Sequence, residues 1–494
     1  MVDSIMSLIQ NGTQIDGNAP ALIEGEQVLI HSQLLDQVKM RAMELGGNRQ
    51  MRIAICASNS IEHILAYLAV LFSGNIWVPM NPANGAKINR KIINIVEPDR
   101  VFFEEDFHDQ IWGARQPTVL AGDGEDSLAA RSAKTNPQEY SPIERRESET
   151  AAIKFTGGTT GEPKGVIQTY GNMFEVIKCM CRFYKFDSAD EYLLVPPLTH
   201  GSSHFVIPVL ASGGCHRIVS SQQPKKIVDA LANTSTLSFM PPTLIYKIME
   251  TVDPPDEGFK KLRHLTYSAA PMPDKRIRQA QSYFGPKLST VYGQTEAPMI
   301  LTTLDAESMQ LQQYVSSVGK VSLPNFIRIT NEEGFEMPSG TIGNIEAKGP
   351  IVMSGYFKNA DLTRETIRNG WLTTGDLGYL DVDGYLFIVG RANDVIISGG
   401  LNIYPAEIES CLAALSGIDE CCVFGIADEY WGERIEAAIT VNCYFDGNTE
   451  TLLCEVRKSL GSVKTPKSLH IISNLPRNAV GKIVRSDIVE LVYA

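Results

Sequence analysis

The alternation of short apolar runs with helical patterns constrains the fold of this chain more than any other feature of its sequence. From residue 51, β-rich runs at residues 52–56, 76–79 and 100–103 are separated by segments with apolar residues at helical spacing. The first of these helices has Asn59 as its expected N-cap. Repeated strand–helix–strand units form largely parallel sheets with helices on their faces. The sequence therefore predicts an α/β fold with doubly wound parallel sheets.

Two stretches interrupt this rhythm. Residues 104–149 are polar and poor in periodic pattern, so we expect a long irregular connection there. Strand and helix patterns alternate again over residues 151–291. Between residues 320 and 389 short β runs are divided by turn signals, which is typical of hairpins and predicts a small antiparallel β subdomain.

A chain of 494 residues is longer than a single hydrophobic core usually organises, so we expect more than one domain. Beyond residue 390 strand and helix patterns mix over a length that suffices for a smaller α+β domain. We therefore expect an N-terminal domain over residues 1–390 and a C-terminal domain over residues 391–494.

Charge and cysteine content exclude several classes of protein. The net charge of −13 disfavours a nucleic-acid partner, because an acidic surface repels a phosphate backbone. The nine cysteines include no C-x-x-C pair, which favours reduced thiols and a cytoplasmic protein. We see no signal peptide, and no apolar run reaches the roughly 20 residues that span a bilayer. The sequence leaves open whether the protein is a monomer or a homodimer.

The densest chemical signal is the glycine- and threonine-rich stretch TGGTTGEPKG at residues 156–165, which follows an apolar strand. Glycines let backbone N–H groups approach phosphate oxygens, threonine hydroxyls add donors, and Lys164 adds a cation. Pro163 precedes that lysine and no G-K-[ST] follows, so the stretch is not a Walker motif. Read alone, it predicts either a triphosphate-binding loop or an ordinary hairpin loop.

With this loop the sequence resembles the adenylate-forming superfamily, which includes acyl- and aryl-CoA ligases. The loop matches the family's T-S-G-T-T-G-x-P-K-G, with Gly157 in place of the serine. Further stretches follow in the family's order and extend the resemblance over nearly the whole chain. These are SAAP at residues 268–271, YGQTE at 292–296, TGD at 374–376, GRANDVIISGGLNIYPAEIE at 390–409 and PRNAVGKIVR at 476–485.

The resemblance implies a two-step reaction. A carboxylic acid and Mg·ATP yield an acyl-adenylate and pyrophosphate, and the thiol of CoA then displaces AMP to give a thioester. It also implies a mobile C-terminal domain that rotates about Asp394 between the two steps. We therefore predict an AMP-forming acyl-CoA ligase whose small-molecule partners are the acid, ATP, Mg²⁺ and CoA.

The resemblance also assigns the nucleotide site. Tyr292 flanks adenine, Thr295 reaches the phosphate, Glu296 binds Mg²⁺, and Asp376 accepts hydrogen bonds from the ribose hydroxyls. A single carboxylate completed by phosphate oxygens is a common way to hold Mg²⁺. The implied ATP- and AMP-binding residues are Thr156, Gly157, Gly158, Thr159, Thr160, Gly161, Lys164, Ser268, Ala269, Ala270, Pro271, Tyr292, Gly293, Gln294, Asp376 and Arg391.

The first step brings two anions together while charge builds on the leaving pyrophosphate. A fixed cation offsets that repulsion, and Lys482 is the residue that the family's C-terminal signature places in this role. The predicted catalytic residues are Lys482, Thr295, Glu296 and His200. The residues implied along the path of CoA are Ser398, Gly399, Gly400 and Trp431. Trp431 either stacks on the adenine of CoA or is an ordinary rim or core tryptophan.

The acid pocket is expected around PPLTHGSSHF at residues 196–205, which resembles the family's P-L-x-H segment. His200 gates or borders the carboxylate in this interpretation, and zinc binding by His200 and His204 is disfavoured because no third ligand is evident. The segment lacks the aspartate that pairs with an amino-acid ammonium, so α-amino acids are disfavoured. We expect an aromatic or medium-length acid in a pocket that includes His200, His204, Phe205, Ala269 and Gly293.

Two alternatives differ from a CoA ligase. A stand-alone adenylation enzyme would load the phosphopantetheine thiol of a carrier protein instead of free CoA. A non-catalytic nucleotide-binding protein would keep the fold without the chemistry, but the presence of Lys482, Glu296 and the loop at residues 156–165 argues against it.

Overall fold

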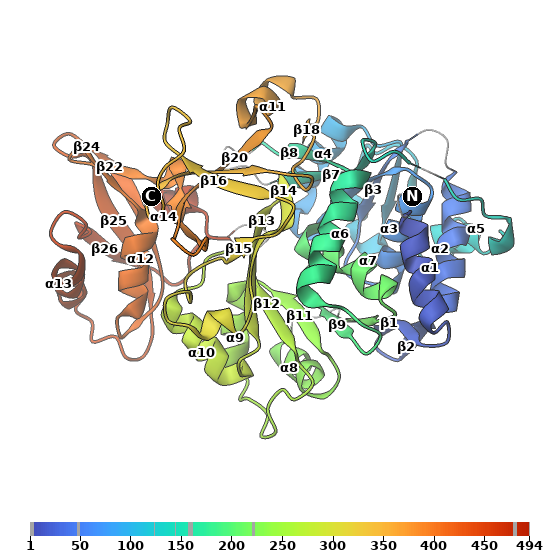
Figure 1. Cartoon of the computed structure of the whole chain (residues 1–494), viewed down its shortest axis with the longest axis horizontal. Helices are drawn as coiled ribbons and strands as arrows, with labels where there is room; N and C mark the ends of the chain where they lie inside the picture. Colours follow the sequence, from blue (N-terminus) through green and yellow to red (C-terminus); the bar gives the residue numbers. More distant parts are fainter. Residues whose placement is uncertain are drawn as a thin grey trace.

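A seven-stranded sheet carries the strand that leads into the predicted phosphate loop (Figure 1). In the computed structural model, which describes residues 4–46, 50–122, 124–143, 145–156, 162–219, 223–477 and 482–493, its central strands are parallel. The strands β7 and β8 form an antiparallel hairpin at one side of the sheet. In spatial order the strands are β18 (Gly355–Tyr356), β8 (Lys164–Thr169), β7 (Thr150–Thr156), β4 (Ile76–Met80), β3 (Arg52–Cys56), β5 (Arg100–Phe103) and β6 (Pro117–Val119).

A nine-stranded sheet forms the second layer of the N-terminal part. Its strands run parallel from β13 to β1, and antiparallel strands flank them at both edges. In spatial order they are β15 (Lys320–Val321), β14 (Ala297–Leu304), β13 (Leu288–Gln294), β12 (His264–Tyr267), β11 (Leu237–Met240), β9 (Glu191–Leu194), β10 (Cys215–Ile218), β1 (Pro20–Glu24) and β2 (Gln27–Ile30). The α/β prediction with doubly wound parallel sheets is confirmed.

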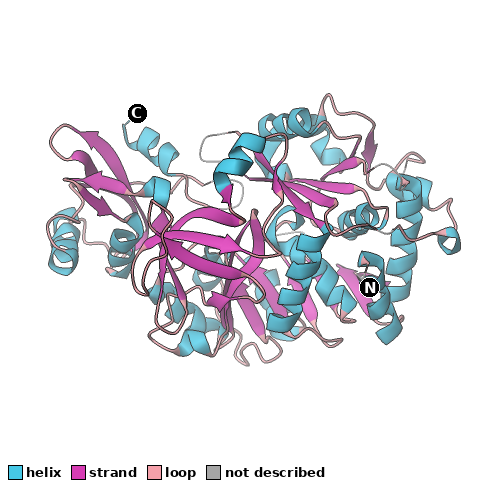
Figure 2. Ribbon diagram, turned by 45° about the horizontal axis from the view of Figure 1, so that its top comes forward, coloured by secondary structure: helices cyan, strands magenta, loops and turns pink. Residues whose placement is uncertain are grey.

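Helices cover the faces of both sheets (Figure 2). The helix α3 is buried along almost its whole length because it packs against strands of both sheets. This explains why its sequence is apolar on every side. The helices of this part are α1 (Ile5–Ile15), α2 (His31–Leu45), α3 (Ile61–Phe72), α4 (Gly85–Val96), α5 (Leu128–Ser132), α6 (Tyr170–Tyr184), α7 (Ser203–Ala211), α8 (Pro224–Asn233), α9 (Pro242–Thr251) and α10 (Asp274–Phe284).

Two sequence-based expectations for this region were wrong. The N-cap of α3 is Ser60, whose side chain accepts a hydrogen bond from His63 N, and not Asn59. Asn59 is instead used in long-range contacts with residues 195–198. The connection over residues 104–149 is not entirely irregular, because it adds β6 to the sheet and contains the short helix α5.

An antiparallel sheet follows, as the turn signals predicted. Its strands are β16 (Phe326–Thr330), β17 (Gly343–Lys348), β20 (Trp371–Leu380), β19 (Ile367–Arg368) and β21 (Leu386–Arg391), with the helix α11 (Ala360–Thr366) beside it. The strands β20 and β21 pair so that Asp376 lies opposite Arg391. This register sets the geometry of the site described below.

The C-terminal residues form a mixed sheet with helices and hydrophobic clusters of their own (Figure 1). Its elements are β22 (Ile396–Ser398), β23 (Leu401–Ile403), α12 (Pro405–Ala414), β24 (Ile418–Asp428), β25 (Gly432–Val441), α13 (Thr449–Leu460), β26 (Ser468–Ile471) and α14 (Arg485–Tyr493). The expected α+β arrangement of this part is confirmed. Among the helices in the described ranges, none has the length and apolar character needed to cross a bilayer.

Candidate active site

Asp376 is the centre of a hydrogen-bond network that joins three strands. Its Oδ2 accepts hydrogen bonds from the Tyr292 hydroxyl at 2.6 Å and from Gln294 Nε2 at 2.9 Å, both on β13. Its Oδ1 forms an ion pair with Arg391 Nε at 2.7 Å. The Asp376 side chain is 8% exposed and that of Arg391 is 45% exposed, so the carboxylate is held from inside and the guanidinium reaches solvent. Burial and the neighbouring Asp376 charge raise the pKa of Tyr292, which stays a hydrogen-bond donor.

Lys482 lies in the electrostatic field of this network. Desolvation by the surrounding protein and the charge of the Arg391 guanidinium lower the pKa of Lys482. The carboxylates of Asp376 and Asp394 have the opposite effect on it. The side chain keeps access to solvent. Lys482 is therefore within electrostatic range of Arg391 and Asp376, although Asp376 precedes it by more than a hundred residues in the sequence.

A hollow of about 180 Å³ opens between the β7 strand, the start of α7 and the β13–β14 hairpin. It contains several of the predicted residues, including His200, Thr295 and Gln294. Its lining consists of Lys154, Phe155, Gln168, Thr199, His200, Gly201, His204, Phe239, Ser268, Ala269, Gly293, Gln294, Thr295, Pro298 and Met299. The predicted acid pocket and part of the predicted nucleotide site thus border one hollow.

Close backbone approach shapes the wall of this hollow. A Cβ on Gly293 would lie 2.8 Å from the backbone N of Met299, so only glycine fits there. Ala269 has a φ of +74°, a conformation that an L-residue adopts only at a cost. Strained backbone of this kind gathers at ligand sites, where the surroundings hold it in place.

His200 is held by a polar contact from the other sheet. Its Nε2 lies 3.1 Å from Nδ2 of Asn81, which follows β4. Burial, with a smaller effect of the Lys154 charge, lowers the pKa of His200 to about 4, so the ring is neutral at physiological pH. Asn59 fixes the segment before it, donating to the carbonyls of Val195 and Pro196 at 3.2 and 2.9 Å.

Lys154 is one of the pocket residues that sequence reasoning missed. It is buried on β7, donates to Ser203 Oγ and lies 3.1 Å from His204 Nε2, and its ammonium sits 5.1 Å from the centre of the Trp77 ring. Burial lowers the pKa of Lys154 to about 7. A single lysine inside the apolar run AAIKF at residues 151–155 is the signal that could have found it.

Thr156 and Lys164 lie opposite each other in the β7–β8 hairpin, at the two ends of the predicted phosphate loop. The loop residues Gly157, Gly158, Thr159, Thr160 and Gly161 lie outside the described residues. Thr295 is positioned from β8, because Gln168 Nε2 donates to its carbonyl at 2.9 Å.

Glu296 has the chemistry that a Mg²⁺ ion needs. Its Oε1 accepts a hydrogen bond from the Tyr356 hydroxyl at 2.9 Å, and its Oε2 has no hydrogen-bond partner among the described residues. The described part of the chain contains no group of three or more His, Cys, Asp or Glu side chains that could form a complete metal site. Glu296 therefore fits an ion whose other ligands come from phosphate and water.

Some predicted residues lie away from the hollow. Phe205 does not line it; this ring is buried behind the wall, stacked on Tyr192 with ring centres 4.5 Å apart, and Phe239 lines the hollow instead. Ala270 and Pro271 follow Ala269 but are not part of the lining. Phe205 was misplaced because a helix alternates faces every few residues, and only packing decides which face meets a cavity.

The residues predicted for the path of CoA cluster in the C-terminal part. Gly399 and Gly400 form a two-residue turn between β22 and β23, both with positive φ, and Ser398 is buried next to them. Gly399 N donates to the Trp431 carbonyl at 2.8 Å, and a Cβ on Gly399 would lie 3.2 Å from the indole ring. The Lys467 ammonium lies 4.9 Å from the centre of that ring.

Asp394, the predicted hinge, precedes β22. Its Oδ2 forms an ion pair with Arg485 Nη1 at 2.6 Å, and Arg485 also contacts Glu409 at 2.8 Å. Arg485 begins α14, three residues after Lys482. This ion pair therefore links the hinge position to the segment that carries Lys482.

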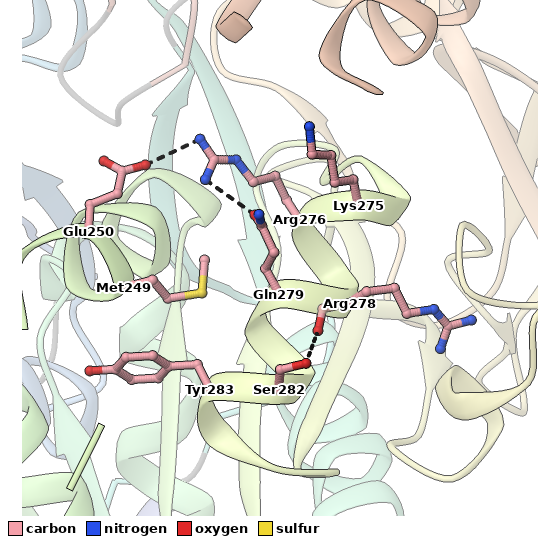
Figure 3. A pocket seen from close by; sticks show the side chains of 8 residues that line it. All are labelled: Met249, Glu250, Lys275, Arg276, Arg278, Gln279, Ser282 and Tyr283. Atoms are coloured by element: carbon pink, nitrogen blue, oxygen red, sulfur yellow. Dashed lines mark hydrogen bonds and ion pairs between the residues drawn. The ribbon is translucent and has the colours of Figure 1, made fainter. Parts of the chain in front are cut away.

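A second hollow of about 690 Å³ lies on the surface between α9 and α10 (Figure 3). None of the predicted site residues lines it. Arg276 pairs with Glu250 at 3.2 Å across this hollow. The Arg276 guanidinium also stacks over the Tyr246 ring. The predicted site residues His200, Gln294 and Thr295 line the smaller hollow.

Comparisons with known proteins find a family match, related sequences and similar solved structures. The sequence matches the AMP-binding enzyme family over residues 10–357 and the AMP-binding enzyme C-terminal domain over residues 407–482. It is 27% identical over 492 residues to medium/long-chain-fatty-acid–CoA ligase FadD8 of Mycobacterium tuberculosis, covering 94% of this chain and 86% of that protein. It is 31% identical over 467 residues to 2-succinylbenzoate–CoA ligase of Bacillus cereus, covering 91% and 90%. The crystal structure of ATP-bound MatB from Rhodopseudomonas palustris has a TM-score of 0.92 at 27% identity, covering 99% of this chain and 100% of that one.

Proposed function

The chain belongs to the family of AMP-binding enzymes, and from this premise we propose that it is an AMP-forming carboxylic acid–CoA ligase. It activates a carboxylic acid with ATP and passes the acyl group to CoA as a thioester. One observation carries this assignment. Gln294, which borders the hollow, donates to Asp376, and Asp376 pairs with Arg391 within electrostatic range of Lys482.

In the first step a carboxylate oxygen attacks the α-phosphorus of ATP, and the bond to the leaving pyrophosphate breaks. Asp376 and Tyr292 hold the ribose and adenine end of the nucleotide, while Thr295, which lines the hollow, reaches the phosphate. Lys482 lies within electrostatic range of Asp376, and its positive charge offsets the repulsion between carboxylate and phosphate. His200, neutral because its pKa is about 4, borders the acid without adding charge.

Mg²⁺ would be held by Glu296 together with phosphate oxygens, and it would neutralise charge on the triphosphate. Glu296 is positioned for such a ligand by the Tyr356 hydroxyl and by its own backbone, whose carbonyl accepts from Met353 N at 2.8 Å. The resulting carboxylate is fixed in place but retains one oxygen for a cation.

In the second step the thiol attacks the acyl carbonyl, AMP leaves and the thiol proton is released. We propose that the unit over residues 391–494 rotates about Asp394 relative to residues 1–390, which withdraws Lys482 and brings in Gly399 and Gly400. The Asp394–Arg485 pair would have to rearrange in that motion. CoA as the thiol is supported by Trp431, whose half-exposed ring lies against Gly399 with Lys467 above it.

The acid is set by the pocket. The relatives act on substrates as different as a medium- or long-chain fatty acid and 2-succinylbenzoate, so family membership alone does not identify the acid substrate. The hollow of about 180 Å³ is smaller than the 300–1,000 Å³ typical of drug-sized ligands, which favours a compact aromatic or medium-length acid. None of the residues that line it is acidic, so an α-amino acid would lack a partner for its ammonium.

All nine cysteines are free thiols, which supports a cytoplasmic location.

The test of the function is release of AMP from ATP in the presence of Mg²⁺, CoA and a panel of aryl, fatty and short carboxylic acids. Sustained turnover with free CoA supports the ligase. Exchange of pyrophosphate into ATP without turnover on free CoA would instead indicate a carrier-protein acceptor, and the absence of both would reject the adenylating function.

A further inference from the structure

Lys154 is a buried lysine whose ammonium has no anionic partner among the described residues. The residue is 6% exposed, and no carboxylate of the described residues lies within ion-pair distance of its ammonium. Its contacts are the Ser203 hydroxyl, the imidazole of His204 and the face of the Trp77 ring. A buried ammonium with only neutral partners is costly, so an anion bound in the hollow would stabilise its charged form.

The ammonium has one donor to spare. A lysine ammonium carries three N–H donors, and Ser203 Oγ and His204 Nε2 take two of them, each at 3.1 Å. Both acceptors are fixed. Ser203 donates its own proton to the His200 carbonyl at 2.9 Å, and His204 is held neutral because burial lowers its pKa well below the usual value. Among the described residues no acceptor takes the third N–H, and Lys154 lines the hollow.

The position of Lys154 separates it from the reacting end of the acid. On β7 it shares a face with Thr156, where the phosphate loop begins, but lies two residues deeper in the sheet. Two strand residues span about 7 Å. The carboxylate that attacks the α-phosphorus must be near the loop and Thr295. Pairing that same carboxylate with Lys154 would draw electron density away from the attacking oxygen.

We propose that the acid activated by this enzyme carries a second carboxylate on its acyl part, and that this carboxylate binds the ammonium of Lys154. The inference rests on the proposed ligase function and specifies its substrate class as dicarboxylic acids, aliphatic or aromatic. Lys154 is a specificity-determining residue in this arrangement. Ser203 and His204 are positioning residues that aim the ammonium, and Trp77 supports the cation from the side away from the acid.

The test uses unreactive mimics of the acyl-adenylate, so that it does not depend on turnover. Acyl sulfamoyl adenosines are prepared in pairs, one from a dicarboxylic acid and one from the monocarboxylic acid of equal chain length, over four to eight carbons and with one aromatic pair. Binding to the full-length protein is measured by calorimetry. At one or more lengths we expect the dicarboxylic derivative to bind about 10- to 100-fold more tightly than its partner.

Lys154→Met should abolish this preference while leaving the affinity for the monocarboxylic derivative within about threefold, and Lys154→Arg should retain part of it. The matched control is Lys320→Met, because Lys320 also lies over an aromatic ring, 4.4 Å from the centre of Tyr385, but is exposed and outside the hollow. It should leave both affinities unchanged.

The outcomes separate the two levels of the proposal. Equal binding of both derivatives at every length, or a loss in Lys154→Met that is equal for both, would overturn the second-carboxylate inference and leave the ligase function standing. Failure of every derivative to bind, together with no AMP release with any acid, would reject the ligase function and the inference with it.

Discussion

The ammonium of Lys154 lies 3.1 Å from Nε2 of His204, inside the hollow that also contains Thr295. The imidazole accepts this hydrogen bond because burial and the lysine charge keep it neutral. The pair comes from β7 and α7, and so joins the strand that leads into the phosphate loop to the helix that follows His200. This buried lysine should affect two measurable properties of the protein, the pH dependence of ligand binding and the stability of the fold.

Binding of an acid with a second carboxylate should weaken as pH rises above about 7. The pKa of Lys154 in the free protein is lowered to about 7, so above that pH the neutral amine must take up a proton before it can pair with an anion. The titratable groups that face it, His200 and His204, are neutral throughout this range because burial lowers their pKa values. Calorimetry from pH 6 to 9 should show a loss approaching tenfold per pH unit for the dicarboxylic adenylate mimic. Parallel profiles for the monocarboxylic mimic would contradict the assignment.

Lys154→Met should make the protein more stable at neutral pH. In the native state the lysine loses its proton near pH 7, whereas the unfolded chain keeps it up to about pH 10.5, so the lysine lowers stability most below pH 7 and the deficit shrinks as pH rises. At about 1.4 kcal/mol per pKa unit, the shift sets an upper limit of about 5 kcal/mol. Since His204 loses a donor in the variant, we expect a net gain of about 1–4 kcal/mol.

Urea unfolding at pH 6, 8 and 10 measures this gain, which should be largest at pH 6. A variant less stable than the wild type at pH 6 would show that Lys154 is a structural residue. A gain in stability combined with a loss of substrate preference is typical of a binding residue that costs the fold free energy.

Lys482→Ala should lose the first half-reaction and keep the second. Removing one fixed cation from the site of charge build-up lowers the adenylation rate by about 10²–10³-fold. Thioester formation from supplied acyl-adenylate and CoA should change by less than about threefold, because the lysine has no role in that step. Quench-flow measurement of each half-reaction checks this, with Lys458→Ala, an exposed lysine paired with Glu455, as the control. Equal loss of both steps would refute the role given to Lys482.

Asp376→Asn should weaken ATP binding with little effect on the acid. The carboxylate is held at 2.6 Å by Tyr292 and at 2.7 Å by Arg391, and the neutral amide accepts fewer hydrogen bonds and leaves the guanidinium unpaired. Loss of a charge-assisted hydrogen bond is equivalent to about 1.5–3 kcal/mol, so the KM for ATP should rise about 10-fold or more. Steady-state kinetics with each substrate varied in turn measures this. An unchanged KM for ATP would place the ribose elsewhere.

Trp431→Ala should raise the KM for CoA and spare pyrophosphate exchange. Stacking of a base on an aromatic ring contributes about 1–3 kcal/mol, so an increase of about fivefold or more is expected. Trp112→Ala is the control, because Trp112 is 72% exposed and lies far along the chain from the residues of the CoA path. If both variants behave alike, Trp431 is a rim residue and the acceptor thiol is recognised by other groups.

The sequence was most informative where chemistry requires particular residue types at fixed spacing. The strand and helix periodicities predicted the parallel sheets, the antiparallel subdomain and the mixed C-terminal part. Motif matches named Tyr292, Asp376 and Arg391, and the structure joins these three through one carboxylate. The local pattern gave a wrong helix N-cap at Asn59. Its side chain forms hydrogen bonds with the backbone of residues 195–198 and does not cap the nearby helix.

The sequence by itself determined the class of fold and the nucleotide chemistry, because backbone periodicity and phosphate-binding motifs are local properties of the chain. Tertiary structure alone decided which side chains face the acid. In the folded protein Phe205 is buried in the core, Phe239 lines the hollow, and Lys154 is buried among neutral partners. The reason is that burial and orientation depend on packing between strands and helices far apart in sequence, and it is burial that turns an ordinary lysine into a cation that needs an anion.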